Sequence, residues 1–481
     1  MTYISLEYYI LVIVSLIVYY FLPVGRRWLA LLAGSAVFYY FAASDIRQYV
    51  LFVCTIALSF AGALWIEAVS EPKKRKALLW SVILISAAPL LVMKVTGILQ
   101  GHLREGFERI PLIVPVGLSF YTLQIISYLA DVYRGKIRAQ RNPFKYALFI
   151  SFFPQIIQGP IPRYEQLGGQ LFEGRSFSID AIVRGSQRIL WGFFLKLMIA
   201  DKAAVAVNEI FNNYGNYEGA YVWVAGILYS IQLYTDFLAC TTIAQGVAEL
   251  FGIEIVDNFR HPYFAVSVQD FWRRWHRSLS EWLRDYVYIP LGGNRKGTVR
   301  KYINLCITFL VSGLWHGEGI RFLFWGGLHA FYQIFGTCTA PLRNRACEMM
   351  KLSEGTFSRR LFQTLGTCFW VMTAWIIFRA NSLRSGLHMI RSMLTVFNPW
   401  ILLNGSLDSI MPYQEWGLLS ASILVLFFVS RAQEKGSVRD RISEQHLTIR
   451  WGLALACIAI IMIFGTYGFG YDAQAFIYGG F

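Results

Sequence analysis

The sequence predicts an all-α integral membrane protein. Of its 481 residues, 56% are hydrophobic and only 15% are charged, and the mean hydropathy is +0.46. A soluble domain carries about a quarter charged residues. The apolar residues fall in long runs separated by short basic connections, as in multipass proteins that obey the positive-inside rule. These observations favour a bundle of membrane-spanning helices.

The net charge of +15 raises the possibility of a nucleic-acid partner. The basic residues cluster in the short connections between apolar runs, which the topology of a membrane protein explains, so we expect no nucleic acid. The seven cysteines are scattered and show no spacing typical of a metal site. We therefore expect neither a metal nor a bound cofactor.

The first five spans are expected at residues 4–24, 28–43, 49–69, 77–99 and 111–132. The first run has no basic residue before it and two arginines after it, so the N-terminus is expected outside. It lacks the basic start and cleavage site of a signal peptide, so we expect it to be retained. Residues 73–76, which are all basic, mark the cytoplasmic side.

The rest of the chain is less regular. Proline and glycine interrupt an apolar run near residues 154–162, which predicts a re-entrant segment that is shielded by protein or lines a wet cavity, because lipid cannot satisfy non-helical backbone. Seven further spans are expected at residues 182–200, 220–238, 302–315, 322–335, 361–378, 418–429 and 451–468. Several are shorter than the roughly 20 residues that cross a bilayer, so the membrane is thin there or some segments do not cross.

The basic excess of residues 431–450 places this loop in the cytoplasm and the aromatic tail, residues 467–481, outside. No internal repeat is visible. One continuous membrane domain over residues 1–481 is the simplest organisation.

Residues 267–317 carry the most information. Ser267 and Asp270 have capping-box spacing, and apolar or aromatic side chains then recur every three or four residues: Trp272, Trp275, His276, Leu279, Trp282, Leu283 and Tyr286. This predicts one amphipathic helix at the membrane interface, ended by Pro290 and two glycines. The apolar run that follows ends in Trp315 and His316, so His316 is expected near or within lipid depth.

Several motifs together resemble the membrane-bound O-acyltransferases, in particular the bacterial alginate O-acetyltransferase branch. They are PVGLSFYT (115–122), DVYRG (131–135), GPIPRY (159–164), IADK (199–202), DFWRRWH (270–276), PLGGN (290–294) and GLWHG (313–317). The resemblance implies a ring of about eleven transmembrane helices, with re-entrant helices, around a central tunnel. It also implies that His316 is the catalytic histidine and that His276 is its partner at the other end of the tunnel.

The chemistry agrees with this assignment, because acyl transfer from a thioester to a hydroxyl needs a base with a pKa near neutrality, and unperturbed imidazole has about 6.5. The alternative for His316 is an interhelical hydrogen bond, and the alternative for His276 is an interfacial anchor. Arg273, Arg274 and Arg277 suit the phosphates of a donor, and lipid headgroups explain them equally well.

Other candidate site residues are weaker. Asp236 is an acid within an apolar run and should face a cavity or a cation. His329 either assists His316 or packs beside glycines. Trp272, Trp275, Trp315 and Asn294 belong to the motifs and are candidates for contacting substrate or donor.

Tyr478 in the tail resembles a tyrosine implicated as an acyl relay in the related teichoic-acid D-alanyl transferase system. A tethered phenol can reach a buried histidine that a bulky polymer cannot. The alternative is that the aromatic residues of the tail form an interfacial anchor.

The resulting hypothesis is a multipass enzyme of the bacterial plasma membrane that moves an acyl group, most simply acetyl, across the membrane. The donor would be a cytoplasmic thioester, either acetyl-CoA or an acyl carrier protein's phosphopantetheine. The acceptor would be an extracellular envelope polysaccharide, reached through a secreted or membrane-anchored acyltransferase partner. The alternatives are a transporter or flippase and a non-catalytic scaffold of an export complex, although the inverted repeat of a transporter is not visible.

Overall fold

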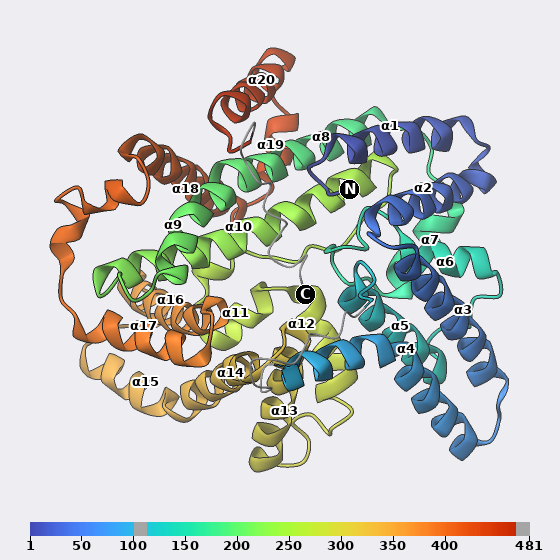
Figure 1. Ribbon diagram of the computed structural model, residues 1–481, viewed down its shortest axis with the longest axis horizontal. Helices are drawn as coiled ribbons and strands as arrows, with labels where there is room; N and C mark the ends of the chain where they lie inside the picture. Colours follow the sequence, from blue (N-terminus) through green and yellow to red (C-terminus); the bar gives the residue numbers. More distant parts are fainter. Residues whose placement is uncertain (101–112, 468–481) are drawn as a thin grey trace. The chain divides into compact units, whose positions relative to one another are not determined.

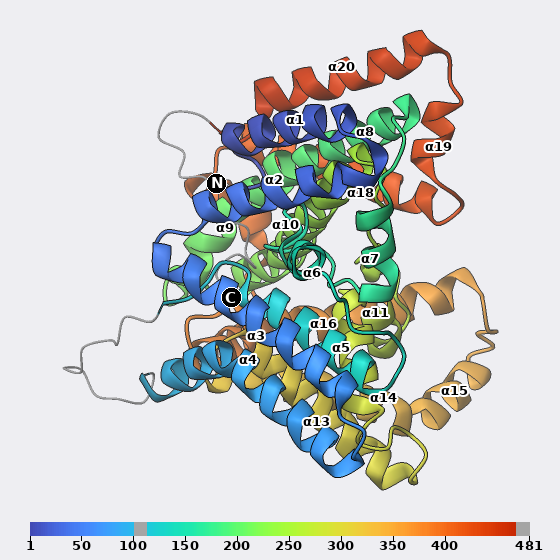
Figure 2. The same cartoon turned by 90° about the vertical axis from the view of Figure 1, so that its right-hand side faces the viewer.

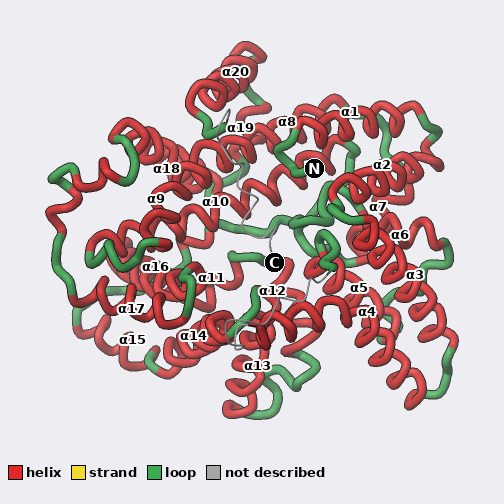
Figure 3. The backbone as a smooth tube through the Cα atoms, in the orientation of Figure 1, coloured by secondary structure: helices red, strands yellow, loops and turns green. Residues whose placement is uncertain are grey.

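The computed structural model describes residues 1–100 and 113–467, and all regular elements in these residues are helical (Figure 3). The all-α prediction is confirmed for this part of the chain. Six of the described helices are long and apolar enough to cross a membrane: α3 (Ile46–Ala68), α4 (Pro72–Gln100), α10 (Ala220–Leu250), α16 (Phe357–Arg379), α18 (Tyr413–Gln433) and α20 (Leu447–Phe464). The ring of about eleven spans stays a prediction.

The described residues form two compact units. The first contains Met1–Gly192 and Cys240–Asp257, and the second contains Phe193–Ala239 and the chain from Asn258 onward. Helices α8 (Ile179–Phe194) and α10 each contribute residues to both units. The single membrane domain over the whole sequence is not tested by this division and stays a prediction.

The first unit begins with helices at the five expected places. Besides α3 and α4 these are α1 (Leu6–Phe21), α2 (Arg27–Ala42) and α5 (Leu118–Tyr133). Helix α1 lies beside α2, and α3 lies beside α4 and α5 (Figures 1 and 2). Helix α5 starts at Leu118 rather than at residue 111, because Gly117 has φ +70° and lies against the carbonyl of Ile156, where a Cβ would clash.

The segment between α6 (Pro143–Ser151) and α7 (Tyr164–Glu173) has no regular helix, and most of its side chains are buried. Gln155 Nε2 donates to Gln124 Oε1 at 3.2 Å, and Gln124 Nε2 donates to the carbonyl of Phe149 at 2.6 Å. Of the two expected alternatives the structure shows shielding by protein, and the re-entrant course of the segment stays a prediction.

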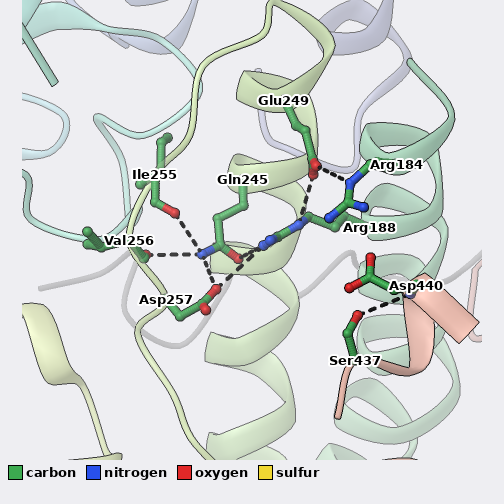
Figure 4. Close-up of polar contacts among 9 residues, drawn as sticks. All are labelled: Arg184, Arg188, Gln245, Glu249, Ile255, Val256, Asp257, Ser437 and Asp440. Carbon is green, nitrogen blue, oxygen red and sulfur yellow. Dashed lines mark hydrogen bonds and ion pairs between the residues drawn. The ribbon is translucent and has the colours of Figure 1, made fainter. Parts of the chain in front are cut away.

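Polar contacts join α8 to the end of α10 in the first unit (Figure 4). Arg188 Nε lies 2.9 Å from Glu249 Oε2, and Gln245 Nε2 donates to the carbonyl of Val256 at 3.0 Å. The two helices approach closely because Gly185 and Gly246 face each other's backbone. The same figure shows, in the second unit, Ser437 accepting a bond from the N–H of Asp440 at the start of α19 (Val438–Ser443).

The second unit contains the motif-rich stretch. It contains parts of α8 and α10, and the whole of α16, α18, α19 and α20. Its other helices are α9 (Asp201–Asn212), α11 (Val268–Arg274), α12 (Arg277–Leu283), α13 (Thr298–His316), α14 (Ile320–Cys338), α15 (Ala340–Met349) and α17 (Leu383–Thr395). Helices α13 and α14 pack on each other, and α14 packs on α16. Four of these helices, α9, α15, α17 and α19, were not predicted, because their apolar runs are too short to be membrane spans.

The prediction of one helix through residues 268–289 is wrong. Helix α11 ends at Arg274, His276 has a left-handed backbone conformation (φ 42°, ψ 54°), and α12 starts at Arg277. A π-helical segment, η4 (Arg284–Tyr288), follows. Aromatic spacing alone does not reveal this break, because contacts from a distant segment hold it.

Candidate active site

Helices α13 and α14 cross at two glycines, each three residues before a histidine. A Cβ on Gly313 would overlap the carbonyl oxygen of Phe322, and a Cβ on Gly326 would overlap the carbonyl oxygen of Phe309. Close backbone approach at small residues is typical of membrane helix pairs. The crossing fixes the positions of His316, at the end of α13, and of His329, in the middle of α14, relative to each other.

His316 is enclosed by aromatic side chains. It is the last residue of α13 and is only 1% exposed. Its ring lies 4.7 Å from the Trp315 ring, 5.0 Å from that of Trp325 and 5.7 Å from that of Phe378, measured between centroids. These contacts leave the imidazole little room to rotate and keep bulk water away from it.

His276 lies at the break between α11 and α12 and is also buried. Its Nδ1 lies 3.3 Å from Asn258 Oδ1, which also accepts bonds from the N–H and the hydroxyl of Ser278 at 3.2 and 2.7 Å. The N–H of Arg277 donates to the Asn258 carbonyl at 2.9 Å. Positive φ is uncommon outside glycine and costs about 1–3 kcal/mol, so these bonds hold a conformation that the chain would not otherwise adopt.

The two histidines belong to one cluster. Their ring centroids are 6.5 Å apart, and the Trp315 ring lies 6.0 Å from that of His276. The expectation that His276 stands at the opposite end of a tunnel from His316 is therefore wrong, because the break after α11 turns its ring toward the end of α13. A direct hydrogen bond needs about 3 Å between nitrogens, which rings at this separation do not reach. A small group between them would be within reach of both.

His329 is held by the neighbouring helix. Trp272 Nε1 donates to His329 Nδ1 at 3.1 Å, and both side chains are buried. Trp275 stacks on Phe271 with centroids 5.4 Å apart and lies 5.1 Å from Trp375. The structure thus brings Trp272, Trp275, Trp315 and the three histidines into one aromatic cluster. His329 is held in this cluster by its hydrogen bond to Trp272 and by aromatic packing.

One face of α13 is polar and buried as it leads to His316. Asn304, Thr308, Ser312 and His316 are spaced four residues apart, and all four are buried. Asn304 Nδ2 donates to the carbonyl of Gly293 at 2.9 Å, and the Thr308 hydroxyl donates to the Asn304 carbonyl at 2.7 Å. At 1.5 Å per residue this face extends about 18 Å from Asn304 to His316.

The candidate phosphate-binding residues are not part of the cluster. Arg274 Nε lies 3.0 Å from Asp270, and Arg277 lies 3.7 Å from Glu281, so these two arginines contact acids one turn away. Arg273 and Asn294 are exposed. A role in binding a donor stays a prediction for all four.

Asp236 faces a cation, as expected for an acid in an apolar run. Its Oδ1 lies 2.8 Å from Lys196 Nζ, and Lys196 Nζ also lies 2.9 Å from Asp201 Oδ1. Lys196 lies in the π-helical segment η2 (Leu195–Ala200), and Phe237, the residue after Asp236, contacts the His276 ring at 4.7 Å. The buried charges therefore border the histidine cluster through Phe237. Tyr478, the candidate relay, lies outside the described residues.

Comparison with known proteins places the cluster inside a family domain. Residues 136–373 match the model of MBOAT, the membrane-bound O-acyltransferase family, and all three histidines fall within this range. A peptidoglycan O-acetyltransferase of Helicobacter pylori is 33% identical over 421 residues, which cover 80% of this chain and 73% of the relative. The chain belongs to the membrane-bound O-acyltransferase family.

Other relatives carry related names. A probable alginate O-acetylase of Pseudomonas fluorescens is 36% identical over 331 residues, which cover 67% of this chain. A teichoic acid D-alanyltransferase of Bacillus subtilis is 28% identical over 266 residues, which cover 52% of this chain and 65% of the relative. The match spans 63% of the length of the Pseudomonas protein, less than two thirds. The resemblance inferred from the motifs is confirmed at the level of the family.

Proposed function

We propose that this chain transfers an acyl group, most simply acetyl, from a cytoplasmic thioester to a hydroxyl group destined for an extracellular envelope polysaccharide. The observation that carries the proposal is the buried His316 and His276 pair within the family domain, with ring centroids 6.5 Å apart. The names of the relatives support the choice of substrate, because they refer to alginate, peptidoglycan and teichoic acid.

In this proposal His316 is the general base. Its imidazole takes the proton of the acceptor hydroxyl while the hydroxyl oxygen attacks the thioester carbonyl carbon. The carbon–sulfur bond then breaks, and the imidazolium returns the proton to the leaving thiolate. His276 is a positioning partner: its Nδ1–H is directed at Asn258 Oδ1, so its Nε2 can accept a hydrogen bond from an amide N–H of the donor's arm. The aromatic enclosure excludes water and so limits hydrolysis of the thioester.

The donor in this proposal is acetyl-CoA or the phosphopantetheine of a carrier protein. Both carry amide groups along the arm that ends in the thioester, and the polar face of α13 offers hydrogen-bonding side chains over a comparable length. A secreted or membrane-anchored acyltransferase would complete the modification outside. Tyr478 would relay the acyl group to it.

Replacement of the two histidines tests the proposal. His316→Ala should lower envelope acylation by roughly a hundred- to ten-thousand-fold, the usual contribution of a general base, and His276→Ala should leave residual turnover. Acyl groups released from the purified polymer by mild base can be measured by mass spectrometry. His446→Asn, at an exposed histidine that caps α20, is the matched control and should have no effect.

Membrane abundance must be equal for all variants. Unchanged acylation in His316→Ala would contradict the enzyme hypothesis and favour a transporter or an export scaffold. Loss in His276→Ala with retention in His316→Ala would show that the base has been misassigned.

A further inference from the structure

A surface cavity of about 550 Å³ lies in the second unit, between the start of α17 and the loop that joins α9 to α10. Its lining is polar and includes Tyr214, Glu218, Arg384 and His388, together with the amide side chains of Asn212, Asn213 and Asn216. None of these residues belongs to the histidine cluster. The volume is within the range of small-molecule sites, about 300–1,000 Å³.

Hydrogen bonds beside the cavity tie its two walls to each other. The loop before α10 is tied to α17 and its following turn, because the N–H of Gly219 donates to Ser392 Oγ at 3.0 Å and the N–H of Ala220 donates to Asn398 Oδ1 at 2.7 Å. Asn398 Nδ2 also donates to the Glu218 carbonyl at 3.2 Å. Gly219 has φ +60°, and a Cβ there would overlap Asn398, so this contact requires glycine. These bonds fix the loop that carries Glu218 against α17 and its following turn.

The α17 wall presents two side chains from one helical face. Arg384 and His388 are four residues apart, and the capping box of Ser382 and Ser385 fixes the start of this helix. The His388 ring meets the Tyr214 ring edge to face, with centroids 5.8 Å apart. An aromatic ring beside polar groups offers a surface on which the apolar face of a sugar ring can pack.

The charges of the cavity do not neutralise each other. Within the described part of the chain, neither Arg384 nor Glu218 takes part in an ion pair, although both line the same cavity. A guanidinium binds a carboxylate through paired hydrogen bonds, and a carboxylate together with three amides offers both acceptors and donors to hydroxyl groups. This set of groups fits a saccharide that carries a carboxylate.

The position of the cavity along the chain favours the outer face of the membrane. It follows the C-terminal end of α16, whereas the other end of α16 carries Arg359 and Arg360 and follows a connection with three more basic residues. It also precedes α18, whose far end leads into the basic loop of residues 431–450. Both basic stretches indicate the cytoplasm, so the cavity lies at the opposite ends of these helices.

We propose that this cavity is a binding site for an acidic saccharide unit of the extracellular acceptor polymer. The choice of a polymer rests on the proposed function, and the choice of an acidic sugar rests on Arg384 and His388. Binding here would hold the polymer at the membrane surface and raise its concentration near the site where the acyl group emerges.

Direct binding to the purified full-length chain in detergent tests this proposal. The probes are a hexasaccharide of uronic acid and a neutral glucose hexasaccharide of equal length, measured by saturation-transfer NMR and titration. The wild-type chain should prefer the uronic-acid probe. Arg384→Ala should weaken that binding about tenfold, the size expected for one charge-assisted hydrogen bond, and should leave neutral-sugar binding unchanged.

Arg391→Ala is the matched control, because Arg391 is an exposed arginine of the same helix that does not line the cavity. It should bind like the wild type. Arg384→Lys, which keeps the charge without the planar fork, should fall between wild type and Arg384→Ala. Equal weakening by the control, or no preference for the acidic probe in the wild type, would overturn the proposal.

The same titration with His316→Ala separates this inference from the proposed function. Saccharide binding should be unchanged in that variant, since His316 lies in a different cluster. If the chain binds the saccharide but His316→Ala leaves acylation unchanged, the enzyme proposal is wrong and the cavity proposal stands. If His316→Ala abolishes acylation but the wild-type chain binds no saccharide, the cavity proposal is wrong and the enzyme proposal stands.

Discussion

At the scale of single residues, Lys196 is a buried cation paired with two buried acids. It is 1% exposed, and its ammonium group lies between the carboxylates of Asp201 and Asp236 at 2.9 and 2.8 Å. A buried charge is tolerated only when it is paired, because desolvation of one ion costs several kcal/mol. The three groups therefore stabilise the fold as a unit, and a change at the shared cation affects both acids.

We predict that Lys196→Met destabilises the chain more than Asp236→Asn does. Loss of the lysine leaves two buried carboxylates without their cation and should cost about 3–5 kcal/mol, whereas loss of Asp236 leaves the pair with Asp201 in place. Thermal unfolding in detergent, followed by tryptophan fluorescence, measures the order. Lys435→Met, at an exposed position, should change the unfolding temperature little. A smaller effect for Lys196→Met than for Asp236→Asn would contradict this assignment.

Some of these residues could be predicted from the sequence, and others could not. An acid in an apolar run is expected to face a cavity or a cation, and Asp236 meets a cation; the same reasoning applied to Lys196 predicts an acid beside it. Asn258 could not be found in this way. It lies in a polar connection, and its importance comes from the left-handed conformation of His276, which only the folded chain reveals.

At the scale of elements, the placement of His316 depends on how closely α13 and α14 approach. The sequence predicts both helices well, because each is a continuous apolar run, and their observed bounds differ from the expected ones by only a few residues. Their crossing point was not predicted. Glycines occur throughout membrane helices, and only the structure shows that Gly313 and Gly326 face backbone while Gly327 faces open space.

These two neighbouring glycines of α14 give a matched pair of variants. Gly326→Ala should push α14 away from Phe309 of α13, lower the unfolding temperature and reduce acyl transfer, because the histidines would move apart. Gly327→Ala should be neutral or slightly stabilising, since alanine favours a helix by up to about 1 kcal/mol and nothing lies within 4 Å of its added methyl group. The readouts are unfolding temperature and envelope acylation. Equal effects of the two changes would show that the crossing does not position His316.

At the scale of the whole molecule, the basic connections and the apolar helices give one consistent topology. From the charges we predict that α3 runs from outside to inside toward the basic residues 73–76, and that α18 and α20 flank a cytoplasmic loop, residues 431–450. The sequence therefore predicts the sidedness of these helices from charge alone, whereas their packing into two units depends on side-chain contacts that no periodicity encodes. Sidedness matters for the proposed function, in which the acyl donor and the acceptor polymer lie on opposite faces of the membrane.

This topology predicts which positions an impermeant thiol reagent can reach. In a chain whose seven cysteines are replaced by serine, Thr2→Cys should react in intact cells, because Arg26 and Arg27 at the other end of α1 indicate the cytoplasm. Lys74→Cys and Lys435→Cys should react only after the cells are permeabilised, although both positions are exposed in the fold. Reaction of Lys74→Cys in intact cells would reverse the orientation of α3 and α4. Reaction of Lys435→Cys in intact cells would show that α18 has the opposite orientation. It would also contradict the placement of the saccharide cavity on the outer face.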